Sequence, residues 1–102
     1  KDVILDPGFS FGKTLEQNYR IMDGMDRLHE LGLPLLVGIS RKSMISRVLQ
    51  TDASGALNGT TVLNTIALLK GASILRVHDV RECVEAVRIV GSMRHCADGS
   101  AI

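Results

Sequence analysis

The chain has 102 residues, enough for one domain at most, and its 45% apolar and 23% charged residues are typical of a globular protein rather than a disordered one. A net charge of +1 gives no reason to expect nucleic acid or an anionic membrane as a partner, and an aromatic content of 3% argues against a base-stacking surface. No apolar run approaches the roughly 20 residues of a membrane span.

The first predicted unit is a strand at residues 3–5, a glycine-rich turn at residues 6–13 and a helix that ends at Gly32. Thr14 and Gln17 have the spacing of a capping box, in which each side chain bonds the backbone N–H of the other residue. Apolar residues at helical spacing follow, so this segment is predicted to be one amphipathic helix.

Two further units repeat this plan. The second starts with an apolar strand at residues 35–39, which we expect to be covered on both faces. Its strand ends in the basic segment 40–43, and a loop at residues 51–59 leads to a helix at residues 60–70. The third unit starts with a strand at residues 73–78.

The last predicted helix begins at Asp79, which with Glu82 has the capping-box spacing. Cys83 lies on its apolar face and is predicted to be a core residue. Two cysteines without a metal-like cluster indicate reduced thiols of a cytosolic protein. The helical pattern fades from residue 94 onward, so the residues after it are predicted to form a mobile tail.

The spacing of the units predicts an α/β fold. Asp6, Lys42 and Arg76 follow the three strands at intervals of 36 and 34 positions, which is typical of parallel strands joined by right-handed crossovers. A barrel and a doubly wound sheet both contain such units, and a complete (β/α)8 TIM barrel needs around 250 residues. The chain also opens on Lys1 without an initiator Met, so we expect a fragment that supplies three units.

Asp6 and Lys42 are candidate ligand-binding residues because each follows a strand end. The Asp6 carboxylate can accept two hydrogen bonds from the N–C–N edge of a heterocycle, and Gly8 and Gly12 let the backbone approach a ligand closely. The alternative is that Asp6 only caps its own Asp-Pro-Gly turn. Lys42 with Arg41 stands at a helix start, where cations are disfavoured without an anionic or π-rich partner; the alternative is a solvated basic pair.

Arg76 and His78 form the sharpest candidate site. Residues two apart on a strand point to the same face, and both precede a helix N-terminus. A guanidinium, an imidazole and free backbone N–H groups suit a phosphate-type ligand. The alternative is a structural histidine. A phosphate-binding Walker loop, a zinc motif and a nucleophile elbow are all absent from the sequence.

These segments together resemble the dihydropteroate synthase family. Its Asp-Pro-Gly segment is matched at residues 6–13, its Ser-Arg-Lys-Ser segment at 40–43 and its Arg-Val-His-Asp-Val segment at 76–80, in the family's order and at its separations. Ser10 departs from the pattern, since many members carry glycine there. The resemblance implies that the chain is the C-terminal part of a pterin-binding TIM barrel and supplies its last three βα units.

The resemblance also implies a reaction and the residues that perform it. Family members join p-aminobenzoate to 6-hydroxymethyl-7,8-dihydropterin pyrophosphate and release pyrophosphate, in folate biosynthesis. By analogy Asp6 binds the pterin, Lys42 contacts pterin and aminobenzoate, and Arg76 with His78 holds the pyrophosphate, so Lys42, Arg76 and His78 are the expected catalytic residues. The expected substrate-binding residues are Asp6, Phe11, Gly38, Ser40, Arg41, Lys42, Arg76 and His78.

Further expectations come from the family alone. They are Mg²⁺ held mainly through the substrate pyrophosphate, with its protein ligand outside this chain, a cytoplasmic homodimer without nucleic-acid or membrane partners, and a role as a sulfonamide target. An isolated fragment is expected to be inactive and prone to self-association. Two other functions stay open: a pterin-binding methyltransferase domain, against which Arg76 and His78 argue, and a non-catalytic phosphate- or pterin-binding module.

Overall fold

The computed structural model describes residues 3–9, 13–39 and 41–99, with the backbone alone at residues 41–43 and 53. The elements in chain order are α1 (Leu15–Asp23), α2 (Met25–His29), β1 (Leu36–Gly38), a π-helix (Arg41–Ser46), α3 (Arg47–Leu49), a 3-10 helix (Ala53–Gly55), α4 (Leu57–Leu69), β2 (Ile74–Arg76) and α5 (Val80–Ala97). Within these ranges, no helix is long and apolar enough to cross a membrane.

The strands are parallel, as the spacing predicts. β1 pairs with β2 in the register Leu36↔Ile74, Val37↔Leu75 and Gly38↔Arg76. The predicted first strand is reduced to a single parallel bridge between Leu5 and Leu35. Both named strands are shorter than predicted, and β2 ends at Arg76 rather than at residue 78.

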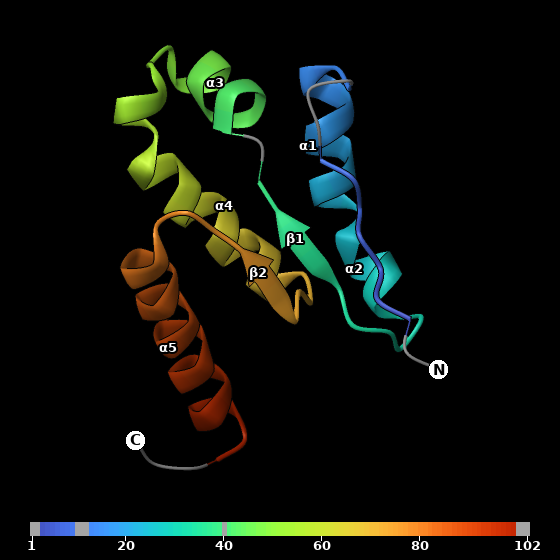
Figure 1. Cartoon of the computed structure of the whole chain (residues 1–102). Helices are drawn as coiled ribbons and strands as arrows, with labels where there is room; N and C mark the ends of the chain where they lie inside the picture. The colour runs from blue at the N-terminus through green and yellow to red at the C-terminus, as the bar shows by residue number, and fades with distance from the viewer. Residues whose placement is uncertain (1–2, 10–12, 40, 100–102) are drawn as a thin grey trace.

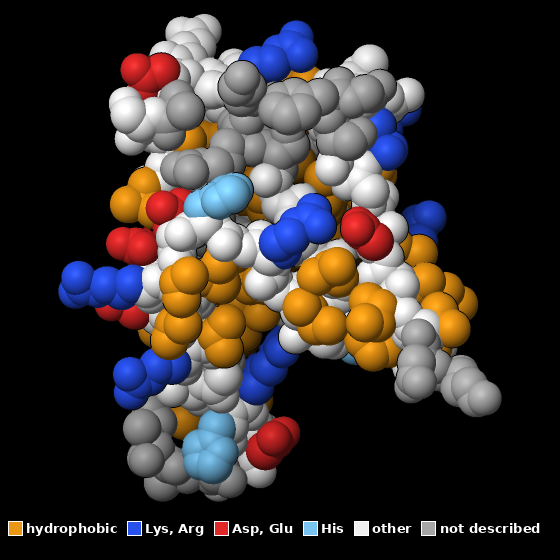
Figure 2. Space-filling view, viewed as in Figure 1, with side chains coloured by type: hydrophobic (Ala, Val, Ile, Leu, Met, Phe, Trp, Pro, Cys, Tyr) orange, Lys and Arg blue, Asp and Glu red, His pale blue; other side chains and the backbone are white. Residues whose placement is uncertain are grey.

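The helices and the sheet enclose one main core. α4 passes behind the two strands, with α1 and α2 on one side and α5 on the other (Figure 1). Val37 is fully buried against this core, and its register partner Leu75 packs there too. The opposite face of β2 is open: Ile74 and Arg76 are exposed, and hydrophobic side chains lie across the middle of this face (Figure 2). The open face is therefore that of β2, whereas in β1 Val37 is buried and Leu36 and Gly38 are half-buried.

The first helix starts as predicted but does not run unbroken to Gly32. Thr14 Oγ1 accepts from Gln17 N at 3.1 Å and Gln17 Oε1 accepts from Thr14 N at 2.9 Å, so the capping box is confirmed. At Gly24 the backbone closes α1 and α2 begins. Glycine has a low helix propensity, and the apolar periodicity that continues beyond it hides the break.

α4 starts within the predicted loop, at Leu57. Asn58 and Gly59 are loop-type residues in the sequence, but Gly59 is buried here for a packing reason. A Cβ at Gly59 would lie 2.5 Å from Cγ2 of Ile45, so only glycine lets α4 approach the π-helix segment this closely. The prediction of a loop at residues 51–59 was therefore wrong for its last three positions.

α5 differs from prediction at both ends. Asp79 occupies the N-cap position, but its side chain makes no capping hydrogen bond, so the predicted capping box with Glu82 does not form. The ψ of Asp79 is 78°, far from the extended backbone that caps α1 at Thr14. At the other end the helix continues past residue 94 to Ala97, and Arg94 Nη2 donates to Leu68 O at 2.7 Å. Mobility of the residues beyond it stays a prediction.

Cys83 is confirmed as a core residue of α5. It is buried, and burial raises the pKa of its thiol. The thiol is therefore kept protonated and unreactive near neutral pH.

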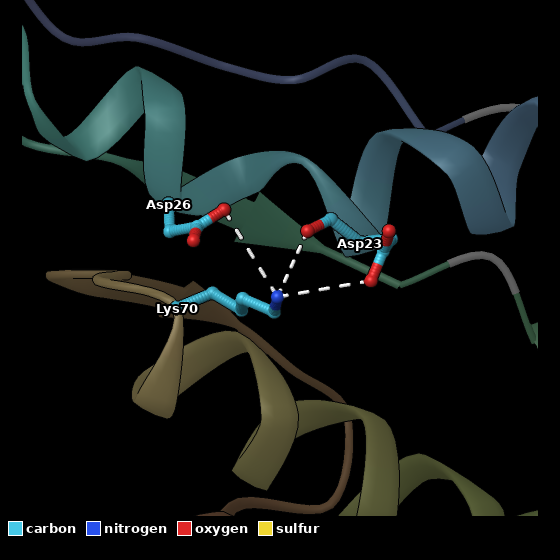
Figure 3. Close-up of polar contacts among 3 residues, drawn as sticks. All are labelled: Asp23, Asp26 and Lys70. Atoms are coloured by element: carbon cyan, nitrogen blue, oxygen red, sulfur yellow. Dashed lines mark hydrogen bonds and ion pairs between the residues drawn. The ribbon is translucent and has the colours of Figure 1, made fainter.

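Lys70 connects the end of α4 to the α1–α2 segment (Figure 3). Its Nζ donates to Asp23 O at 2.8 Å and lies 3.8 Å from Asp23 Oδ1 and 4.0 Å from Asp26 Oδ1. Both carboxylates are largely exposed, so the hydrogen bond to the carbonyl is the stronger part of this contact.

Lys70→Met is expected to lower the free energy of unfolding by about 0.5–1.5 kcal/mol, because it removes this hydrogen bond and keeps the aliphatic part of the side chain. Urea unfolding of the protein measures the change. Arg20→Met is the control, since it removes only an exposed i,i+4 pair with Glu16 and should change stability by less than about 0.5 kcal/mol. Equal losses in the two variants would contradict the proposed role of Lys70.

Candidate functional site

Three of the predicted site residues stand at the carboxyl ends of the parallel segments. Asp6 follows the bridge at Leu5, Gly38 ends β1 and Arg76 ends β2. Because parallel segments end at the same edge of a sheet, Asp6, Gly38 and Arg76 share one edge. Ligands of parallel α/β proteins bind at this edge.

The Asp6 carboxylate is oriented by its own turn. Asp6 Oδ1 accepts from Gly8 N at 2.8 Å, and Gly8 has a φ of 81°, which is favourable for glycine. Lys13 Nζ donates to Gly8 O at 2.7 Å and holds the turn from the other side. A carboxylate has about four acceptor positions, so one bond to the turn leaves capacity for a ligand. The capping interpretation is thus correct and does not exclude binding.

Arg76 lies directly over Gly38. A Cβ at Gly38 would be 2.6 Å from Arg76 Nη2 and 2.9 Å from its Nε. These two residues are register partners in neighbouring strands, so the Arg76 side chain lies on the face to which a Cβ at Gly38 would point. Gly38 therefore has a clear structural role, which is to leave the space that the guanidinium occupies.

Gly38→Ala is expected to move the Arg76 guanidinium off β1, because real Cβ contacts below 3.0 Å essentially never occur. A crystal structure of the variant would show the displacement. Gly91→Ala is the matched control, since nothing lies within 4 Å of the Cβ position there and the structure should stay unchanged. An unmoved guanidinium in Gly38→Ala would refute this account of Gly38.

His78 borders the site from the loop after β2 and not, as was predicted, from the strand itself. β2 ends at Arg76, so the alternation of a strand no longer fixes the direction of His78. Both residues are exposed, and both line a small cavity that also borders Asp79, next to the start of α5. A guanidinium and a helix N-terminus together favour an anion at this edge.

The other predicted site residues are not placed. Phe11 and Ser40 lie outside the described residues, as do the side chains of Arg41 and Lys42. The backbone of Arg41 and Lys42 begins the π-helix, a geometry that is frequent at functional sites. Among the described residues, no three His, Cys, Asp or Glu side chains gather as a metal site would require.

Sequence reasoning missed two polar residues beside the site. Thr60 and Asn64 of α4 are both buried and line the same cavity as Arg76 and His78. The sequence signal for them is weak, because α4 also carries Asn58, Thr61 and Thr65 and these two residues do not stand out among them.

The model of the family "Pterin binding enzyme" matches residues 1–78. The chain belongs to this family. The match includes the Asp6 turn, both strands and the segment that carries Arg76 and His78.

Curated family relatives are named dihydropteroate synthase. The chain is 50% identical to the one from Escherichia coli strain K12 over 88 residues, which cover 86% of this chain and 31% of that protein. It is 43% identical to the one from Clostridium beijerinckii over 90 residues, or 87% of this chain and 34% of that protein. The chain thus spans about a third of the length of these relatives.

Solved structures agree. The Yersinia pestis enzyme with a pterine-sulfa conjugate superposes with a TM-score of 0.86 at 46% identity, covering 91% of this chain and 37% of that one. A Coxiella burnetii dihydropteroate synthase in complex with pteroic acid gives a TM-score of 0.83 at 38% identity, covering 89% and 35%. The α/β arrangement of parallel strands and covering helices is therefore that of known dihydropteroate synthases.

Proposed function

We propose that this chain is part of a dihydropteroate synthase. The enzyme would join p-aminobenzoate to 6-hydroxymethyl-7,8-dihydropterin pyrophosphate and release pyrophosphate, which is a step of folate biosynthesis. The observation that carries the proposal is the Arg76 guanidinium, seated over Gly38 at the edge that also presents Asp6. Identities of 50% and 43% to curated synthases support it.

We also propose that the three units are the last three of a (β/α)8 TIM barrel. Parallel pairing in the order of residue 5, β1 and β2 supports this arrangement. The exposed face of β2, which carries Arg76, would then point to the barrel interior. The active sites of such barrels lie at the carboxyl ends of the strands, where Arg76 and Asp6 stand.

The proposed reaction is a displacement at the pterin methylene carbon. The amine nitrogen of p-aminobenzoate forms a bond to that carbon, the carbon–oxygen bond to pyrophosphate breaks, and the amine loses one proton. Negative charge develops on the leaving oxygen, so a cation already in place at Arg76 lowers the barrier. No protein nucleophile is needed.

The other residues have binding roles in this proposal. Asp6 accepts hydrogen bonds from the amino-pyrimidine edge of the pterin with the acceptor positions that its turn leaves. His78 shares the pyrophosphate with Arg76, and Lys42 contacts the pterin. Phe11, Ser40 and Arg41 border the aminobenzoate.

Mg²⁺, a homodimer and a cytoplasmic location belong to the same proposal. Bound Mg²⁺ would neutralise charge on the pyrophosphate. Among the described residues no three His, Cys, Asp or Glu side chains gather as such a site would require, and we propose that the protein ligand of the metal lies outside this chain. A Yersinia pestis dihydropteroate synthase has been solved as a complex with a sulfonamide drug, and we propose that this protein shares sulfonamide binding.

The test follows pyrophosphate release from dihydropterin pyrophosphate by the full-length protein, with and without p-aminobenzoate. Release that depends on p-aminobenzoate, with dihydropteroate formed in equal amount, is the expected result. Tight pterin binding without release would instead favour a methyltransferase domain or a non-catalytic pterin-binding module. Pyrophosphate release at the same rate with and without p-aminobenzoate would also contradict the proposal of a synthase.

A further inference from the structure

Asn64 carries a buried polar atom without a partner in the described part of the chain. Asn64 lies on α4 and is 2% exposed, and its side-chain Oδ1 accepts no hydrogen bond from any described group. Buried amide oxygens in native proteins nearly always have a partner, which is either a protein donor or an ordered water. The amide of Asn64 therefore indicates a bound group beside it.

A small cavity adjoins this amide. It has a volume of about 10 Å³ and is bordered by Asn64 and Thr60 of α4, by Ile39 after β1, and by residues 76–79 between β2 and α5. This is about the least space that holds one water molecule, and too little for an organic group. A metal cation is disfavoured because Arg76 borders the same space.

The walls of the cavity have the polar groups that a water requires. Thr60 and Asn64 are four residues apart, so they lie on the same face of α4. Thr60 Oγ1 donates its proton to Ala56 O at 2.9 Å, so toward the cavity it can only accept. The two walls on α4 thus offer two acceptors, Thr60 Oγ1 and Asn64 Oδ1.

The opposite wall is formed by residues 76–79 and not by the first turn of α5. It carries the Arg76 guanidinium, which can only donate, and the Asp79 carboxylate, which is a further acceptor. A water with its two protons toward α4 has a lone pair left for a donor of this segment, which gives it the two to four partners that buried waters have.

We propose that this cavity binds one ordered water, which donates to Asn64 Oδ1 and Thr60 Oγ1 and accepts from the 76–79 segment. Asn64 is then a positioning residue, because the water links the segment that carries Arg76 and His78 to α4. The existence of the water is independent of any activity. Its effect on catalysis rests on the proposed function.

A crystal structure of the full-length protein at a resolution that shows waters tests the site directly. The expected result is a water within hydrogen-bond distance of both Asn64 Oδ1 and Thr60 Oγ1, and its loss in Asn64→Leu, which keeps the side-chain volume without an acceptor. A protein donor bonded directly to Asn64 Oδ1, or a dry cavity, would overturn the proposal. The crystal structure decides whether the water is present, and it does so whether or not the protein is a synthase.

Steady-state kinetics distinguish a positioning role of Asn64 from a contribution to protein stability alone. Asn64→Leu is expected to raise the KM for dihydropterin pyrophosphate about fivefold, while the KM for p-aminobenzoate changes less than twofold. Asn64→Asp, which keeps an acceptor oxygen, should recover a lower KM. The matched control is Thr65→Val. In the wild type the Thr65 hydroxyl donates to Thr61 O, and Thr65 lies on another face of α4. If both Asn64→Leu and Thr65→Val lower the melting temperature but leave the ratio of the two KM values unchanged, the positioning role is rejected.

Discussion

Arg76→Ala in the full-length protein is expected to lower kcat/KM for dihydropterin pyrophosphate by at least about tenfold, which corresponds to about 1.4 kcal/mol of transition-state stabilisation. The guanidinium lies over Gly38, at the edge where we propose that the pyrophosphate binds. A cation beside the leaving pyrophosphate stabilises the negative charge that develops on it. Initial rates of pyrophosphate release, at saturating p-aminobenzoate, measure the loss.

The control removes the same type of charge a short distance away. Arg81 is exposed in the first turn of α5 and pairs with Glu85 at 3.6 Å. Arg81→Ala should change kcat/KM less than about twofold, since rim charges are screened. Arg76→Lys should fall between wild type and Arg76→Ala, because it keeps the charge and loses the planar fork. An unchanged rate in Arg76→Ala, or an equal loss in Arg81→Ala, would remove Arg76 from the pyrophosphate role.

The fold was predictable where several local signals agree. The capping box at Thr14 and Gln17 placed the start of α1 correctly. Apolar runs placed β1 and β2, and the regular spacing of Asp6, Lys42 and Arg76 predicted parallel pairing, which the register confirms. Local capping chemistry and burial act in the same direction in these segments, so the sequence pattern is reliable there.

The sequence was less informative where long-range packing decides the structure. Glycine is typical of loops, yet Gly59 lies in α4. A glycine stands there because a Cβ would collide with Ile45. The capping box at Asp79 and Glu82 has the correct spacing and does not form, since the backbone at Asp79 is not extended. Spacing can identify a capping pattern, but it cannot supply the backbone angles that the cap requires.

The candidate site shows the same division. The residue types at the strand ends indicated the candidate side chains, and two of these residues, Arg76 and Asp6, share one edge, while their roles in binding and catalysis stay predictions. The function of Gly38 as space for Arg76 depends on the pairing of two strands 38 positions apart in sequence, which no local pattern contains. Asn64 was missed because α4 mixes polar and apolar residues and an asparagine among them belongs to no motif, so only its burial makes it informative.

Leu35→Ala is expected to lower the free energy of unfolding of the full-length protein by about 2–5 kcal/mol. Leu35 is fully buried in the core and lies at the point where all three parallel segments meet. It bridges Leu5, and its carbonyl accepts from Ser73 N at 2.9 Å and Ile74 N at 3.0 Å. Alanine keeps these backbone bonds, so the expected loss comes from the side chain and the cavity that it leaves.

Urea unfolding provides the measurement, and Leu31→Ala is the matched control. Leu31 is 62% exposed, so the same substitution there should change stability by less than about 0.5 kcal/mol. An unchanged slope of free energy against urea would show that Leu35→Ala acts on the native state rather than on the denatured one. If Leu35→Ala cost no more than Leu31→Ala, the core would not be centred on Leu35, and the packing that holds Asp6, Gly38 and Arg76 at one edge would have to be placed elsewhere.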